Sequence, residues 1–287
     1  MRAKHRKRAI IIVFLFLFFY ANLWLFKPFI DEKKGKGDAV GLLVLAENFS
    51  NFLFGKPFLA NKAETATEQH FKKEVERQAQ KFSENYFFAK PSEKKLIALT
   101  FDDSPDDWYC PQILAILEKH KVKATFFLIA NRLKKYKDNA EAIKKGGHLI
   151  GNHSFSHKKY TLLSTEQALK DIDSAEVAFQ KEIGLNPKFF RPPYGMITDE
   201  QVIALVQKDY KIINWSIDTY DWNTSRNSPL EIFTQVEQYA HNGGIILMHS
   251  SGRSRENTIL VLPAIIKSLK SRGFRFVTLD KLLPHPL

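Results

Sequence analysis

The chain has 287 residues, of which 44% are hydrophobic and 26% are charged, a composition typical of a globular protein and unlike that of a disordered one. Its formal charge of +12 divides into +5 over residues 1–8, +3 over residues 9–95 and +4 over residues 96–287, because these segments hold 5, 13 and 25 basic side chains against 0, 10 and 21 acidic ones. Most of the chain is therefore only mildly basic, which argues against nucleic acid as a partner.

Residues 9–26 form an uncharged, apolar segment that follows the basic flank of residues 1–8. At about 1.5 Å per residue this segment would form a helix roughly 27 Å long, close to the thickness of the hydrocarbon core of a bilayer. We expect a transmembrane signal-anchor helix in a single-pass protein of the cell membrane. Its N-terminus would be cytoplasmic, because basic flanks stay on that side, and the rest of the chain would lie outside. A cleaved signal peptide is the alternative, and it would also export the rest.

Residues 27–94 are expected to form a juxtamembrane linker followed by a helical stalk. Thr65 and Glu68 have the spacing of a capping box. The apolar residues that follow recur at helical spacing on one face: Phe71, Val75, Ala79, Phe82 and Tyr86. This pattern predicts a helix over residues 65–88 that ends before Pro91 and docks its apolar face on the domain.

Strand and helix patterns alternate through residues 95–287, which we expect to form the catalytic domain. The predicted strands are Leu96–Phe101, Ala124–Ile129, His148–Gly151, Lys211–Ser216, Gly244–Met248 and Phe274–Thr278. The predicted helices are Pro111–Lys119, Asn139–Lys145, Thr165–Ile183, Asp199–Lys208, Pro229–His241 and Asn257–Arg272. The alternation predicts an α/β domain with a largely parallel sheet, in which functional groups collect at the carboxyl ends of the strands. The single cysteine, Cys110, is expected to serve packing.

Polar side chains follow four of the predicted strands: Asp102 and Asp103, His153 and His157, Asp218 and Asp221, and His249. Two adjacent carboxylates at the end of a buried strand repel each other unless a cation or a proton relieves them. His153 and His157 are four residues apart, a spacing that suits two ligands of one metal ion. A divalent ion held by both histidines and one aspartate would lower the pKa of bound water, and the second aspartate could take the proton.

His249 directly follows the apolar run Gly244–Met248. A general acid for a leaving group needs a pKa near the working pH, and histidine is suited to that role. A neighbouring carboxylate such as Asp218 would raise the pKa of His249. The alternative interpretation is a buried or capping histidine.

Five segments, taken in order, resemble the motifs of the polysaccharide deacetylases, the NodB-type homology domain of carbohydrate esterase family 4. They are Thr100-Phe101-Asp102-Asp103-Ser104-Pro105, His153-Ser154-Phe155-Ser156-His157, Arg191-Pro192-Pro193-Tyr194-Gly195, Asp218-Thr219-Tyr220-Asp221-Trp222 and Leu247-Met248-His249. The resemblance extends from Leu96 to about Leu283. It implies a distorted (β/α) barrel of about seven units, fewer than the eight of a full barrel.

By this resemblance Asp103, His153 and His157 would bind one divalent metal ion, usually zinc, with Co²⁺ or Mn²⁺ as alternatives. Asp102 would be the general base and His249 the general acid. The resemblance implies supporting roles for Arg191 beside Asp102, Asp218 beside His249, the backbone N–H of Tyr194 at the oxyanion, Trp222 and Leu247 at the acetyl methyl, and Pro192 at the substrate.

Two departures from the family pattern lie at the rim of the expected site. Ser104 stands where the family usually has glycine, and its Cβ would strain the turn if φ were positive there. Residues 106–111, Asp-Asp-Trp-Tyr-Cys-Pro, are bulkier than is usual at this place. Both departures bear on the range of substrates more than on metal binding.

We therefore expect metal-dependent removal of N-acetyl groups from the sugars of an extracytoplasmic polysaccharide, with release of acetate. Peptidoglycan is the first expectation, because a tethered enzyme that faces outward meets the cell wall. Exported poly-N-acetylglucosamine, chitin oligomers and acetylated xylan are alternatives within the enzyme class. A catalytically degenerate glycan-binding module is the alternative outside it. The sequence indicates no protein partner.

Overall fold

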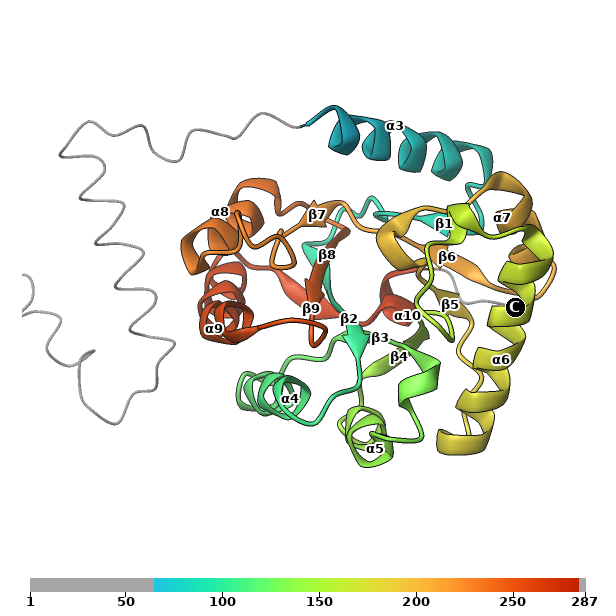
Figure 1. The fold of residues 1–287 in the computed structure, drawn as a ribbon. Coiled ribbons are helices and arrows are strands. Elements are labelled where there is room, and N and C mark those ends of the chain that lie inside the picture. Colours follow the sequence, from blue (N-terminus) through green and yellow to red (C-terminus); the bar gives the residue numbers. More distant parts are fainter. Residues whose placement is uncertain (1–64, 284–287) are drawn as a thin grey trace, which may run out of the picture. The chain divides into compact units, whose positions relative to one another are not determined.

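The computed structural model describes residues 65–283 (Figure 1). The strands are β1 (Tyr86–Phe87), β2 (Leu96–Ser104), β3 (Thr125–Leu128), β4 (Leu149–Asn152), β5 (Phe189–Phe190), β6 (Lys211–Ile213), β7 (Ile217–Asp218), β8 (Gly244–His249) and β9 (Arg275–Val277). The helices are α3 (Ala66–Lys81), α4 (Tyr109–Lys119), α5 (Lys137–Lys145), α6 (Thr165–Ile183), α7 (Asp199–Val206), α8 (Pro229–Tyr239), α9 (Glu256–Ser271) and α10 (Leu279–Leu282).

The predicted transmembrane segment, residues 9–26, lies outside the described residues, as do its basic flank and the linker up to residue 64. Among residues 65–283, the helices are all too short or too polar to span a bilayer. The membrane anchor therefore stays a prediction from the sequence.

The strands form one nine-stranded sheet in the order β1-β6-β5-β4-β3-β2-β8-β7, with β9 paired to β2. The paired strands run parallel throughout. Figure 1 shows the sheet curled into a half-barrel with helices around its outside. The predicted α/β class and parallel sheet are confirmed. Residues 65–283 contain nine strands, three more than the six predicted individually, because three two-residue strands, too short to carry a pattern, join the sheet.

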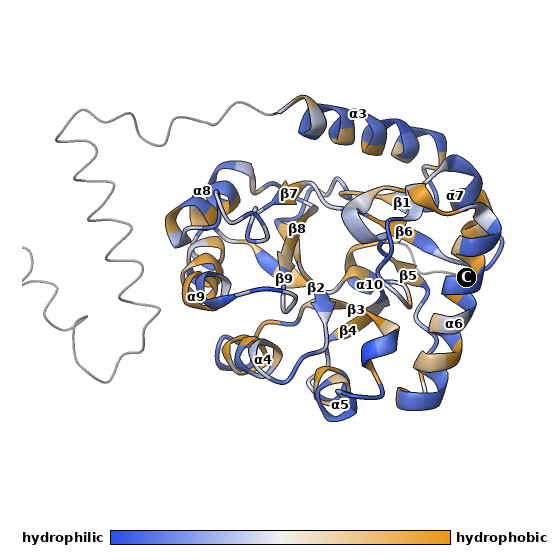
Figure 2. Ribbon diagram, in the orientation of Figure 1, coloured by the Kyte–Doolittle hydropathy of each residue, from blue (hydrophilic) through white to orange (hydrophobic). Residues whose placement is uncertain are grey.

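Strand β2 is the centre of the sheet, because it pairs with β3, β8 and β9. Ile97, Ala98 and Leu99 are fully buried in it. Figure 2 shows hydrophobic residues concentrated in the strands and on the inner faces of the helices. In the pairing of β2 with β8, Asp102 lies opposite His249, so two predicted catalytic side chains leave neighbouring parallel strands at the same edge.

The strand predicted over residues 211–216 is interrupted. Strand β6 ends at Ile213 and β7 begins at Ile217. Asn214 lies between them, fully buried, and its side-chain amide donates to the Tyr86 hydroxyl at 2.5 Å and to the Gly195 carbonyl at 3.0 Å. The backbone N–H of Asn214 still donates to the Phe87 carbonyl at 2.7 Å, and that of Ser216 donates to the Ile245 carbonyl at 3.1 Å, so the chain changes its neighbouring strand across the interruption.

The helix predicted over residues 65–88 ends early. The capping box of Thr65 and Glu68 is confirmed, but α3 ends at Lys81 and Tyr86–Phe87 form β1, so Pro91 does not end the helix. Both aromatic residues are buried against the sheet, where aromatic side chains favour strand geometry over helix. A segment that the sequence assigned to the stalk therefore contributes a strand.

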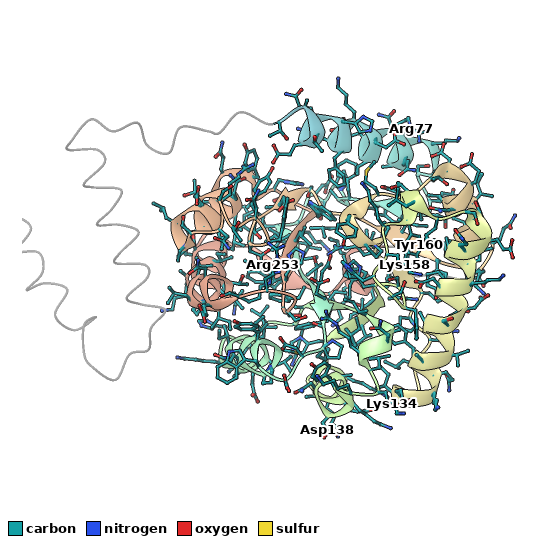
Figure 3. The ribbon with its side chains drawn as sticks, in the orientation of Figure 1. Arg77, Lys134, Asp138, Lys158, Tyr160 and Arg253 are labelled. Atoms are coloured by element: carbon teal, nitrogen blue, oxygen red, sulfur yellow. The ribbon has the colours of Figure 1, made fainter. Side chains whose placement is uncertain are left out.

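The predicted docking of α3 is confirmed. Phe71, Val75, Ala79 and Phe82 pack on a core cluster that includes Ile197 and Val202. Polar contacts secure the same helix to the start of α7. The Arg77 guanidinium binds the Asp199 carboxylate through two contacts of 2.9 and 2.6 Å, and the Lys81 ammonium reaches the same carboxylate at 2.7 Å. Figure 3 shows Arg77 on α3.

Gln78 provides a test of how α3 is held. Its side chain is 1% exposed and its Nε2 donates to the Ile197 carbonyl at 2.8 Å. Gln78→Ala should lower the free energy of unfolding by about 1–3 kcal/mol, because it leaves a buried carbonyl without a donor. Urea unfolding of both variants measures this. Gln80→Ala, an exposed glutamine on the same helix, is the matched control and should stay within about 0.5 kcal/mol of the wild type. Equal effects of the two variants would contradict the role of Gln78.

Candidate active site

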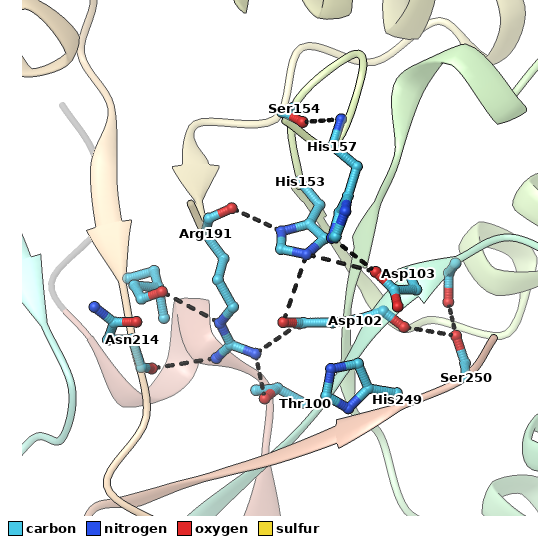
Figure 4. A network of polar contacts seen from close by, with 12 residues as sticks. Thr100, Asp102, Asp103, His153, Ser154, His157, Arg191, Asn214, His249 and Ser250 are labelled. Atoms are coloured by element: carbon cyan, nitrogen blue, oxygen red, sulfur yellow. Dashed lines mark hydrogen bonds and ion pairs between the residues drawn. The ribbon is translucent and has the colours of Figure 1, made fainter. Parts of the chain in front are cut away.

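Four segments bring the predicted site residues to one edge of the sheet (Figure 4). The end of β2 carries Asp102 and Asp103, and the end of β8 carries His249. The loop after β4 carries the two histidines of the predicted metal motif, and Arg191 follows β5 directly. The carboxyl ends of parallel strands meet at the same edge, so these residues, distant in sequence, converge.

Asp103, His153 and His157 form a cluster whose ligand atoms all lie within 4.8 Å of one another. Asp103 Oδ1 lies 3.1 Å from His157 Nε2 and 3.7 Å from His153 Nε2. This carboxylate oxygen is buried and has no hydrogen-bond partner. Two imidazoles and a carboxylate are a donor set that divalent transition metals bind, and a cation would satisfy the unpaired oxygen. The residues present therefore fit a divalent metal ion.

His153 is oriented by its other ring nitrogen. Its Nδ1 lies 2.7 Å from the Arg191 carbonyl, which can only accept, so Nδ1 carries the proton and Nε2 faces the aspartates with a free lone pair. Burial lowers the pKa of His153, which keeps the ring neutral as a metal ligand requires. Burial alone would raise the pKa of Asp103, but the facing imidazoles of His157, His249 and His153 hold it below its usual range.

The loop that carries the two histidines is held by a residue the sequence analysis did not single out. Asp171 on α6 accepts from the Phe155 backbone at 3.0 Å, the Ser156 hydroxyl at 2.5 Å and the Tyr160 hydroxyl at 3.1 Å. The loop needs this support because His157 has a left-handed backbone, with φ of 55°. In the sequence Asp171 is one of several acidic residues in the long helix α6, and nothing in its spacing distinguishes it as a support of the histidine loop.

Arg191 lies beside Asp102 as the family resemblance implied. The guanidinium is fully buried and donates to Asp102 Oδ1 at 2.7 Å, to Thr100 Oγ1 at 2.8 Å and to the Ile213 and Asn214 carbonyls at 3.2 Å each. A buried ion pair is tolerated when its remaining donors are satisfied in this way. The pair fixes one oxygen of Asp102, and the other lies 3.7 Å from His153 Nε2.

The hydrogen-bond partner of His249 is Asp221, whereas Asp218, the carboxylate expected beside it, interacts with His249 only through its charge. His249 Nδ1 lies 2.7 Å from Asp221 Oδ1, and the His249 backbone donates to Asp221 Oδ2 at 2.8 Å. Asp218 instead accepts from the Tyr220 backbone at 2.8 Å and from Trp222 Nε1 at 3.1 Å. The sequence placed Asp218 beyond a strand, but it lies within β7 and its carboxylate organises its own loop.

Asp221 changes the protonation of His249. Burial by itself would lower the pKa of His249, but the hydrogen-bonded carboxylate of Asp221 raises it to about 9. Burial raises the pKa of the Asp218 carboxyl to about 6. Arg255 and Thr258, which the sequence analysis did not identify, hold Asp221 in turn: Arg255 Nη1 donates to its carbonyl at 2.8 Å, and the Thr258 hydroxyl donates to its carboxylate at 2.9 Å.

The predicted substrate-binding residues divide into exposed and buried groups. Tyr194 is 61% exposed, and its ring lies 5.1 Å from that of His157. Trp222 is 41% exposed at the same rim. Leu247 and Pro192 are buried. All four lie next to residues of the site, and their contacts to a substrate stay predictions.

Ser104 does not carry the strain expected from its replacement of glycine. The left-handed backbone falls on Asp103, with φ of 68°, while Ser104 is fully buried and its hydroxyl hydrogen-bonds that of Ser250. Arg132 and Ser251 stabilise the turn by donating to the Asp103 carbonyl at 2.7 and 2.5 Å.

The bulky segment over residues 106–111 covers the turn before α4 and the first three residues of that helix. Asp106 Oδ1 accepts from the Tyr109 and Cys110 backbone amides at 3.0 and 2.7 Å, as a helix-capping carboxylate does. Cys110 is buried, as predicted, and Trp108 is 66% exposed. Neither this segment nor Ser104 displaces a residue of the site.

Residues 89–213 match the family described as polysaccharide deacetylase. The peptidoglycan-N-acetylglucosamine deacetylase of Bacillus cereus is 37% identical over 198 residues, which cover 69% of this chain and 71% of that protein. The crystal structure of the Bc1960 peptidoglycan N-acetylglucosamine deacetylase is similar, with a TM-score of 0.68 and 36% identity over 72% of this chain and 96% of that one.

A further similar structure is BA3943, described as a CE4 family pseudoenzyme from Bacillus anthracis, with a TM-score of 0.63 and 30% identity over 68% of each chain. The fold of this family therefore also occurs in a protein described as a pseudoenzyme, and the assignment depends on the site as well as on the fold. The chain belongs to the polysaccharide deacetylase family, carbohydrate esterase family 4, whose enzymes are hydrolases acting on carbon–nitrogen bonds outside peptides.

Proposed function

We propose that this chain removes the N-acetyl group from sugars of an extracytoplasmic polysaccharide, most directly peptidoglycan, and releases acetate. The observation that carries the proposal is the position of Asp102 and His249, a carboxylate and an imidazole in register on neighbouring strands, beside three residues that could hold a metal ion. The names of the similar deacetylases support peptidoglycan as the substrate. Poly-N-acetylglucosamine, chitin oligomers and acetylated xylan are the alternative substrates.

Asp103, His153 and His157 would hold the metal ion, and we propose zinc, with Co²⁺ or Mn²⁺ as alternatives. When bound, such an ion lowers the pKa of water and polarises a carbonyl oxygen. The support for this site is its donor set together with the buried Asp103 oxygen that lacks a partner.

Asp102 would act as the base. Arg191 fixes one of its oxygens and leaves the other beside His153, in position to accept a proton from water. His249, kept protonated by Asp221, would donate a proton to the amine as it leaves. The Tyr194 backbone N–H would stabilise the oxyanion, with Trp222 and Leu247 at the acetyl methyl and Pro192 lining the substrate.

A degenerate glycan-binding module is the alternative function. The geometry disfavours it, because the base, the acid, the buried arginine and the three metal-site residues are all present and mutually oriented.

We also propose that residues 9–26 anchor the protein in the cell membrane, with the N-terminus cytoplasmic and the domain outside. This rests on the sequence of that segment and its basic flank. Protease added to intact cells should digest the domain without lysis. Complete protection of the domain until lysis would reverse the orientation.

Acetate release tests the function. The purified full-length chain, in detergent, should release acetate from peptidoglycan, and a chelator should abolish the release. Asp102→Asn should still bind the metal, but its rate of acetate release should be about 10²–10⁴-fold lower, because the general base is removed. His157→Ala should lose both metal and activity.

Asp107→Asn is the control for the Asp102 variant, because Asp107 is an exposed acid near the same turn. This variant should bind the metal and release acetate at the wild-type rate. Release by Asp102→Asn at the wild-type rate would show that Asp102 is not the base. Metal bound without acetate release from any of the four substrates would favour the binding module.

The pH profile tests the pairing of Asp221 with His249. Protonated His249 is available below its pKa of about 9 and is lost as the pH rises through that value. Asp221→Asn removes the charge that raises this pKa, so the descending limb of kcat/KM should move to lower pH. Asp218→Asn should move it less, because its hydrogen bonds run to Tyr220 and Trp222. A larger shift for Asp218→Asn would contradict the assignment.

A further inference from the structure

The two histidines of the candidate metal site are oriented in different ways. His153 follows β4 directly, and its second ring nitrogen lies 2.7 Å from the Arg191 carbonyl, so a partner outside the loop fixes its ring. Within residues 65–283, the hydrogen bonds and ion pairs of His157 involve its backbone amide and the Nε2 that faces Asp103, and none involves its Nδ1. The direction of the His157 ring therefore depends on the backbone that carries it.

That backbone has a conformation that the loop would not keep by itself. Ser154 and His157 both lie in the left-handed region, with φ of 72° and 55°. For residues other than glycine this region is strained, and it persists only where the surrounding structure holds it. The Ser154 hydroxyl accepts from the His157 amide at 2.8 Å (Figure 4). This bond closes the turn, but it does not connect the turn to the rest of the domain.

The first half of the loop is anchored to the sheet. Backbone hydrogen bonds of 2.9, 2.9 and 3.2 Å join His153, Ser154 and Phe155 to β3 and the turn after it. Along the loop the last of these bonds is made by Phe155, two residues before His157. The direction of His157 therefore needs a second anchor.

That anchor is the carboxylate of Asp171 on α6. Its Oδ2 accepts from the Phe155 amide at 3.0 Å and from the Tyr160 hydroxyl at 3.1 Å, and its Oδ1 accepts from the Ser156 hydroxyl at 2.5 Å. An ionised carboxylate can accept several hydrogen bonds at once, whereas an amide of the same shape has a single acceptor oxygen. Asp171 thus holds Ser156 on one side of His157 and Tyr160 on the other.

We propose that Asp171 is a positioning residue of the metal site, which sets the direction of His157 and thereby the affinity for the metal ion without binding the ion itself. Arg191 orients His153 through its ring, and Asp171 orients His157 through its backbone. Each histidine thus has its own support, on a different element of the fold. The inference rests on the proposed function, since it assumes that Asp103 and the two histidines hold a metal ion.

The test is the affinity of the full-length chain for Zn²⁺, measured by competition with a chromophoric chelator. Asp171→Asn should weaken binding about 10–100-fold, the range typical for loss of a group that orients a metal ligand. A role in stability alone would leave the affinity of the folded chain unchanged. Asp173→Asn is the matched control, because Asp173 is an exposed acid on the same helix that pairs with Lys208 at 2.9 Å. It should bind zinc as tightly as the wild type.

Ser156→Ala and Tyr160→Phe remove donors to Asp171 and leave the acceptor in place. Together they should also weaken zinc binding, but adding them to Asp171→Asn should cause little further loss, because the same contacts are already broken. Hydrogen exchange of the metal-free chain, measured by mass spectrometry on the peptide of residues 154–160, gives a second readout. Exchange there should be faster in Asp171→Asn than in Asp173→Asn, because the Phe155 amide has lost its acceptor.

Equal zinc affinity of the wild type and Asp171→Asn would overturn the proposal. Unchanged hydrogen exchange in the loop would do the same, since the substitution would then not act through the order of the loop. Failure of the metal site itself would look different, because the wild type would bind zinc no more tightly than His157→Ala. That result would reject the proposed metal site and the positioning role together.

Discussion

Two consecutive carboxylates at the buried end of β2 set the constraint on which the site depends. Asp102 and Asp103 cannot both be left charged and unpaired there, because burial removes the water that would screen them. The structure separates their surroundings. Asp102 receives the buried guanidinium of Arg191, while Asp103 faces two imidazoles and keeps one oxygen without a donor. Because Arg191 pairs with Asp102, the carboxylate of Asp103 remains available to a cation.

The supports of the site follow from that separation. Arg191 is kept in place by two backbone carbonyls at the end of β6, and its own carbonyl orients His153. Asp102, His153 and the break between β6 and β7 are therefore coupled through Arg191. On the other side Asp221 links His249 to α9 through Thr258. Each reactive side chain is thus oriented by a residue on a different element, which limits its motion relative to the others.

Helix α3 joins the domain more closely than a stalk would. Its apolar face completes part of the core, its basic residues bind Asp199, and its Glu68 reaches Arg226 near the rim of the site. A helix held at this many points also lines a cleft of the domain together with α8.

The class of fold, the family and the residues that gather at the candidate site could be predicted from the sequence alone. Strand and helix periods alternate regularly enough to predict the central strands. Paired aspartates and histidines at the strand ends indicated a cluster able to hold a metal ion, because turn chemistry alone does not explain such groups next to buried strands. Features that depend on the direction of side chains became visible only in the folded chain. The structure placed Asp221 rather than Asp218 on His249, ended α3 at Lys81, put the left-handed turn on Asp103 rather than Ser104, and revealed Asp171 as the support of the histidine loop. These outcomes depend on contacts between segments distant in the chain, and local spacing carries no information about them.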